Sequence, residues 1–160
     1  MPKVRKNWLS IIALMAFVSC TSGKISDNDP KKRLQDYISE SFNIKNTEGR
    51  KLLESFLTGE ARSRLAAWSD EQFRKAFVDS KRQFVKLVFR EVKNVSPHEV
   101  HVVYELTYMD QSHGDPAKPS DTKVTAKKLC ELIQENEKWF IKEVRTIKEL
   151  VEYKNEMSLP

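Results

Sequence analysis

Apolar residues follow two different periods along this chain of 160 residues, and the period changes near residue 80. Between residues 30 and 78 they recur every three to four positions, as in helices with one buried face. From residue 84 onward they recur at every second position, as in strands with one buried face. The pattern therefore predicts a helical first half and a β-rich second half.

Short helices are expected in the first half. The first begins at Asp29-Pro30, residues typical of an N-cap and a first helical position, and continues to about Phe42. Two shorter helices follow, and the capping-box pattern SDEQ at 69–72 opens a fourth. The predicted buried face of the first helix holds Leu34, Tyr37, Ile38 and Phe42.

Antiparallel strands are expected in the second half, at Phe84–Val95, Val100–Tyr108, Lys123–Gln134 and Lys138–Ile147. The last two are joined by a two-residue loop at 136–137. Such a loop places Leu132 opposite Ile141 and Glu131 opposite Lys142, an apolar pair on one face and an ion pair on the other. Helices followed by strands predict an α+β fold, with N-terminal helices packed on a curved four-stranded antiparallel sheet.

Two stretches carry a resemblance to a known fold. They are LLESFLTGEARSRL at 52–65 in the helical half and CELIQENEKWFIKEV at 130–144 in the last hairpin. With the order and spacing of the elements over 30–147, they resemble the nuclear transport factor 2-like superfamily, also called cystatin-like. Small bacterial lipoproteins of this fold are especially similar.

The N-terminus has the pattern of a secretory signal. A short basic segment, Met1–Asn7, precedes eleven residues, Trp8–Val18, that are apolar except for Ser10. A membrane-spanning helix needs about 20 apolar residues, so this run is too short to span. The pattern therefore predicts export.

Cys20 directly follows this signal. Phe17-Val18-Ser19-Cys20 resembles the lipobox of bacterial lipoproteins, with Phe17 in place of the preferred leucine. The resemblance implies cleavage before Cys20 and attachment of diacylglyceryl and further acyl chains such as palmitate. Two or more acyl chains anchor a protein stably to a membrane. Thr21 replaces the aspartate that retains many lipoproteins in the inner membrane, so the family rule favours the outer membrane, facing the periplasm.

These patterns divide the chain into a signal peptide at 1–19, a lipidated tether at 20–29 and one domain at 30–160. The formal charge of +5 is concentrated at the N-terminus, where three basic residues lie within the first six positions. Without residues 1–19 the excess of basic over acidic residues falls to two. The domain therefore lacks the charge of a nucleic-acid-binding protein.

No motif in the sequence identifies a reaction or a cofactor. His98 and His101 form a His-x-x-His, but zinc requires three or four convergent ligands, so two surface histidines are the preferred interpretation and no metal is expected. Cys130 occupies an apolar phase of its strand and is expected to be a small buried residue rather than a reactive thiol.

The superfamily resemblance implies a cavity between helices and sheet. The residues expected at such a pocket are Tyr104, Tyr108, Cys130 and Glu143. Alternation places Glu143 on the face of Trp139 and Ile141, toward the helices. The sequence favours an ion pair of Glu143 with Arg145, or another ion pair near the sheet rim. It leaves open an acid–base role for Glu143 with either tyrosine.

The leading functional prediction is a non-enzymatic, membrane-anchored envelope lipoprotein that binds a small apolar ligand or an envelope protein. The alternative is a small cavity enzyme, an isomerase, dehydratase or hydrolase, that uses Glu143 with Tyr104 or Tyr108. A homodimer formed through the open sheet face is a third hypothesis. The membrane is contacted through the lipid anchor alone.

Overall fold

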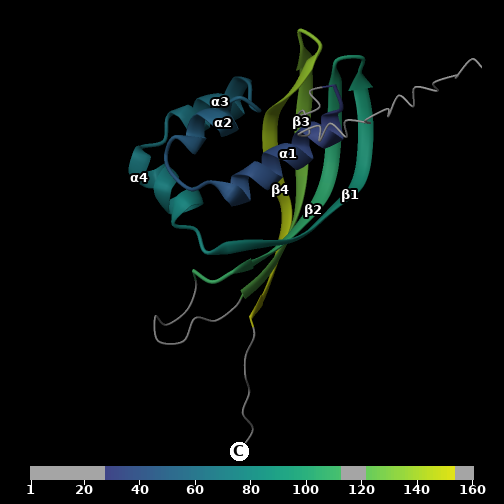
Figure 1. Cartoon of the computed structure of the whole chain (residues 1–160). Coiled ribbons are helices and arrows are strands. Elements are labelled where there is room, and N and C mark those ends of the chain that lie inside the picture. The colour runs from purple at the N-terminus through teal and green to yellow at the C-terminus, as the bar shows by residue number, and fades with distance from the viewer. Residues whose placement is uncertain (1–27, 113–121, 154–160) are drawn as a thin grey trace, which may run out of the picture.

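The computed structural model describes residues 28–112 and 122–153. Helices come first and strands second, which confirms the α+β prediction (Figure 1). The helical half consists of α1 (Pro30–Asn43), α2 (Gly49–Glu54), α3 (Gly59–Ala66), α4 (Asp70–Phe73) and the π-helical turn η1 (Arg74–Val78). The strands are β1 (Arg82–Ser96), β2 (Glu99–Asp110), β3 (Thr122–Glu135) and β4 (Lys138–Tyr153). Cys20 and the predicted signal lie outside the described residues.

Two helix starts follow the predicted capping chemistry. The Asp29 side chain accepts a hydrogen bond from the Lys31 amide at 2.9 Å, and Pro30 occupies the first helical position. At the start of α4 the Ser69 hydroxyl accepts from the Gln72 amide at 3.1 Å, while the Gln72 side chain accepts from the Ser69 amide at 2.8 Å. Both helix N-termini are therefore satisfied by local side chains.

The four strands form one antiparallel sheet in the order β1-β2-β3-β4, so each strand pairs with its neighbour in sequence. The sheet is curved, and α1 lies across its concave side (Figure 1). Strand β4 continues to Tyr153, beyond the predicted end at Ile147. Thr146 faces Lys128 and Lys148 faces Lys127, so Ile147 between them forms a bulge. The rest of β4 beyond this bulge remains paired with β3.

The β3–β4 hairpin has the predicted two-residue loop. Asn136 and Glu137 have φ angles of 49° and 65°, as in the type I′ turns that match strand twist. Leu132 lies opposite Ile141, as predicted. The predicted pairing of Glu131 with Lys142 is wrong, because a bulge shifts the register there and places Glu143 opposite Glu131.

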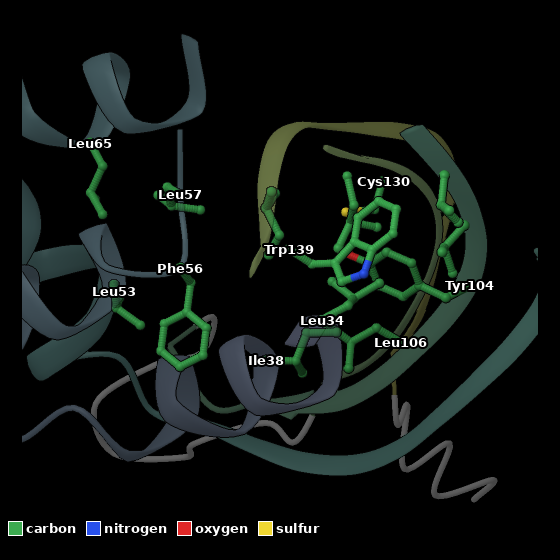
Figure 2. Packing of buried hydrophobic residues seen from close by; sticks show 14 of the residues in the cluster. Leu34, Ile38, Leu53, Phe56, Leu57, Leu65, Tyr104, Leu106, Cys130 and Trp139 are labelled. Carbon is green, nitrogen blue, oxygen red and sulfur yellow. The ribbon is translucent and has the colours of Figure 1, made fainter. Parts of the chain in front are cut away.

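The core fills the space between the helices and the curled sheet. Helix α1 contacts both edge strands, β1 and β4, and so closes the open side of the curl. Figure 2 shows Tyr104, Cys130 and Trp139 inside the curl, with Leu34 and Ile38 of α1 facing them. Among the described residues, the largest fully buried side chains are Leu34, Leu53, Phe56, Phe73, Val102, Thr122, Cys130, Leu132 and Ile141.

The segment after α2 fastens the helical half to the sheet. The Thr58 amide donates to the Ile141 carbonyl at 2.9 Å, and the Ile141 amide donates to the Phe56 carbonyl at 2.9 Å. Leu57 and Ile141 thereby form a parallel bridge. These bonds position α3 against β4.

Among the described residues, no helix has the length and apolar character needed to cross a membrane.

Candidate functional site

A cavity of about 550 Å³ lies between α1, η1 and the concave face of the sheet. Its size is within the range of small-molecule sites. Its walls come from every layer of the fold, so the site exists only when helices and sheet are assembled. The lining residues are Tyr37, Ile38, Ser41, Phe42, Trp68, Lys75, Ala76, Phe77, Asp79, Ser80, Arg82, Tyr104, Leu106, Tyr108, Asp110, Ser112, Lys128 and Val144.

Tyr104 and Lys128 form the floor of this cavity. They lie directly opposite each other in the β2–β3 ladder and therefore share one face of the sheet. Both line the cavity. Tyr104 is buried and Lys128 is partly buried. The register of the two strands thus places this lysine and this tyrosine in neighbouring positions of the cavity floor.

The tyrosine hydroxyls at the cavity are held in their neutral form. Burial, with a smaller effect of Cys130, raises the pKa of Tyr37 to about 12. The pKa of Tyr104 is also raised, mainly by burial and further by Cys130 and Tyr37. At neutral pH both groups therefore carry a proton and can donate a hydrogen bond.

Lys128 lies in surroundings that disfavour its charged form. Burial lowers the pKa of Lys128, Glu149 opposes this effect, and the nearby positive charge of Arg82 adds to it. Within the described part of the chain, Lys128 donates no hydrogen bond and forms no ion pair. Burial removes water from around the Lys128 ammonium, and an anion entering the cavity would replace that lost interaction.

Arg82, by contrast, is held in the wall of the cavity. Its guanidinium donates to the Ala76 carbonyl at 2.5 Å and to the Ser80 hydroxyl at 2.7 Å. It also lies 5.7 Å from the Phe42 ring centroid and 5.9 Å from that of Tyr108. Arg82 therefore joins η1, β1 and α1 at one edge of the cavity.

The other charged lining groups are also paired. Asp110 is buried and accepts a hydrogen bond from the Ser112 amide at 2.9 Å. Asp79 lies 3.4 Å from the Arg74 guanidinium, and Lys75 lies 3.0 Å from Glu71. These partners leave Lys128 as the lining charge that is available to a ligand.

The structure brings two of the expected pocket residues to the cavity. Tyr104 and Tyr108 both line it, and burial raises the pKa of Tyr108 as well. Cys130 lies on the same face but is completely buried beneath the lining. Burial, with a smaller effect of Glu131, raises the pKa of the Cys130 thiol, so it remains protonated and is a core residue rather than a nucleophile.

Glu143 does not reach the cavity. The bulge at Lys142 reverses the alternation of β4 after Ile141, so Val144 takes the core-facing position that simple alternation assigns to Glu143. Glu143 shares the outer face with Glu131, its partner in the ladder. The predicted placement of Glu143 toward the helices was wrong. Of the ion pairs expected for Glu143 near the sheet rim, the one with Arg145 was also wrong, because the Arg145 guanidinium is paired with Glu131.

The sequence interpretation did not include Tyr37, Arg82 and Lys128 in the site. Lys128 carried a recognisable signal, because it interrupts the buried phase of β3 that contains Val124, Ala126, Cys130 and Leu132. A cation in an otherwise apolar phase of a strand indicates a group aimed at a cavity or a buried partner. Tyr37 and Arg82 carried no comparable signal, because it is the packing of α1 and η1 against the start of β1 that brings them to the cavity.

The two histidines expected at the surface are separate from this cavity. His98 Nδ1 lies 3.2 Å from the Gln134 side-chain oxygen, and His101 Nε2 lies 3.2 Å from a Glu99 carboxylate oxygen. Glu131 is the cross-strand partner of His101, and one ligand atom from each of Glu99, His101 and Glu131 lies within 4.8 Å of the others. Glu131 is already engaged by Arg145.

No protein-family model matches the sequence, and no curated protein matches it. Among solved structures, the fold is similar to that in the crystal structure of the intermembrane space region of chloroplast protein ARC6. The TM-score is 0.51 at 16% sequence identity, over 74% of this chain and 95% of that chain. The likeness shows a shared fold.

Proposed function

We propose that this chain is a lipid-anchored lipoprotein of the bacterial envelope whose α+β domain binds a small, largely apolar ligand without transforming it. The cavity is the observation that carries the binding function. Ten of its eighteen lining residues are aromatic or aliphatic, and the other eight are polar or charged. Small-molecule sites commonly combine apolar walls with polar groups that fix the orientation of the ligand.

The anchoring part of the proposal rests on the sequence. Cys20 follows an apolar run of eleven residues that is interrupted once, and the preceding residues resemble a lipobox. Anchoring through acyl chains would hold the domain at the periplasmic face of the outer membrane on a ten-residue tether.

The enzymatic alternative depends on two residues that do not meet in the structure. That alternative required the Glu143 carboxylate beside the Tyr104 or Tyr108 hydroxyl. Since Glu143 lies on the outer face of the sheet, it cannot exchange a proton with a molecule in the cavity. Binding without chemistry is therefore the proposal that the geometry supports best.

Lipid attachment is tested by growing cells with a labelled fatty acid and comparing the wild type with Cys20→Ser. We expect label on the wild type and none on the variant, which accumulates as precursor or is released. A matched control is Cys130→Ser, which leaves the modified position intact. Label that persists on Cys20→Ser would overturn lipidation at this residue.

Ligand binding is tested by purifying the full-length protein in a mild detergent from its native membrane and analysing it by native mass spectrometry. We expect a bound small molecule that is lost when the cavity is filled by Leu106→Trp. Co-purification of a stoichiometric protein instead would favour a protein partner. Detection of neither would contradict the binding proposal.

A further inference from the structure

Three hydrogen-bond donors in the wall of the cavity are available to a ligand. They are the Lys128 ammonium and the hydroxyls of Tyr37 and Tyr104, for which no described residue serves as an acceptor. Burial keeps both hydroxyls protonated. These residues therefore offer three donors and the charge of Lys128 to a molecule in the cavity.

A second hollow extends the cavity in an apolar direction. It has a volume of about 200 Å³ and shares Tyr37, Trp68, Phe77 and Val144 with the cavity. The rest of its wall is Leu57, Ala61, Arg64 and Leu65, which come from α3 and the segment before it. Figure 2 shows Leu57 and Leu65 on the helical side, away from Tyr104. The larger cavity thus holds Lys128 and the other polar lining groups, whereas the wall of the second hollow is aliphatic or aromatic except for Arg64.

We propose that the cavity selects an amphipathic carboxylate, with the carboxylate at Lys128, Tyr37 and Tyr104 and the apolar body directed along Trp68 and Phe77 toward Leu57 and Leu65. This inference rests on the proposed binding function and names the chemical class of its ligand. The carboxylate accepts hydrogen bonds from all three donors, and such charge-assisted bonds are the strong ones.

The same arrangement discriminates against other amphiphiles. A neutral alcohol of the same length has one hydroxyl and no charge, so it brings no counter-ion to the partly buried Lys128. An amine places a third cation in the cavity that holds Lys128 and Arg82 and is repelled. Inorganic phosphate has the charge but leaves the apolar hollow unfilled.

The test compares octanoate, 1-octanol, octylamine and inorganic phosphate as probes of the full-length protein in vesicles of neutral phosphatidylcholine. Binding is followed by the concentration-dependent rise in Tm and by tryptophan fluorescence, to which Trp68 in the cavity contributes. We expect octanoate to bind at least about tenfold more tightly than octanol, the difference that one charge-assisted hydrogen bond provides. Octylamine and phosphate are expected not to bind.

Lys128→Met removes the charge and keeps the length of the side chain. It should weaken octanoate binding about tenfold or more and leave octanol binding unchanged. Lys127→Met is the matched control, because Lys127 is the exposed neighbour on the opposite face of β3, and it should change neither. Tyr104→Phe keeps the buried ring and should weaken octanoate binding several-fold. If Lys128→Met does not fold by circular dichroism, Tyr104→Phe and the wild-type comparison of octanoate with octanol decide the question.

Equal binding of octanoate and octanol would overturn the carboxylate assignment while leaving the cavity as an apolar binding site. Equal effects of the Lys128 and Lys127 variants would also overturn it. Absence of binding by every probe would contradict the proposed binding function itself.

Discussion

Glu143 lies directly opposite Glu131 in the β3–β4 ladder, on the sheet face that points away from the helices. Two like charges in this position repel each other. Arg145, two residues along the same strand, forms an ion pair with Glu131 and compensates only one of the two carboxylates.

Glu143→Gln removes this repulsion. We expect the free energy of unfolding to rise by about 0.2–1 kcal/mol, because like charges placed directly opposite destabilise a ladder by that amount. Urea denaturation measures the change. The control is Glu152→Gln on the same strand, where the carboxylate is paired with Lys123 at 2.9 Å and its loss should cost up to about 1 kcal/mol. A fall in stability for Glu143→Gln, or a loss of ligand binding, would contradict the placement of Glu143 on the outer face.

Glu137 has a left-handed backbone, with φ of 65°, at the second position of the β3–β4 turn. Asn-Gly is the preferred sequence for such a turn. Glu137→Gly should therefore raise the free energy of unfolding by roughly 0.5 kcal/mol. Glycine relieves the backbone strain, and this gain exceeds the cost of the greater conformational entropy that glycine has in the unfolded chain. Glu137→Ala keeps the strain and serves as the control in thermal unfolding. A destabilised glycine variant together with an unchanged alanine variant would be inconsistent with this turn geometry.

Arg33 is a buried cation in the helical half of the core. Its guanidinium lies 4.2 Å from the Phe56 ring centroid and donates to the Ser55 carbonyl. Arg33→Lys loses the planar stacking and this hydrogen-bond geometry, so we expect a loss of about 1–3 kcal/mol of unfolding free energy. Arg62→Lys at an exposed position of α3 should change stability by less than about 0.5 kcal/mol. Guanidinium denaturation of both variants tests the difference, and equal values would mean that Arg33 contributes no more than a surface arginine.

Tyr37 makes the stability of the fold sensitive to alkaline pH. Its pKa is raised to about 12 in the folded protein, against about 10 in an unfolded chain. The unfolded chain therefore loses this proton first. The stabilising contribution is fully present below pH 10 and is lost as the pH rises toward about 12.

Tyr37→Phe should make stability fall less steeply between pH 10 and 12, as measured by urea midpoints at several pH values. The decline should not disappear, because burial of Tyr104 acts in the same direction. Tyr153→Phe, at an exposed position of β4, is the control and should leave the slope unchanged. An unaltered slope for Tyr37→Phe would show that the Tyr37 hydroxyl does not ionise with unfolding.

Local patterns in the sequence were enough to predict most of the fold. The N-cap at Asp29, the capping box at Ser69–Gln72 and the two-residue turn at 136–137 each depend on side chains a few positions apart. Alternation located the four strands and placed Tyr104, Tyr108 and Cys130 toward the helices. The extension of β4 to Tyr153 was missed, because its exposed residues show no clear alternation and are held by pairing with β3.

The sequence by itself therefore determined the element order, the fold class and the burial of Cys130, since these follow from the period of apolar residues and from turn chemistry. The tertiary structure alone decided which polar groups meet. A one-residue bulge at Lys142 placed Glu143 on the outer face, because adding one residue to a strand reverses the direction of every side chain after it. Packing of α1 and η1 on the curved sheet brought Tyr37 and Arg82 to Lys128, because a cavity wall consists of residues that are close in space and distant along the chain.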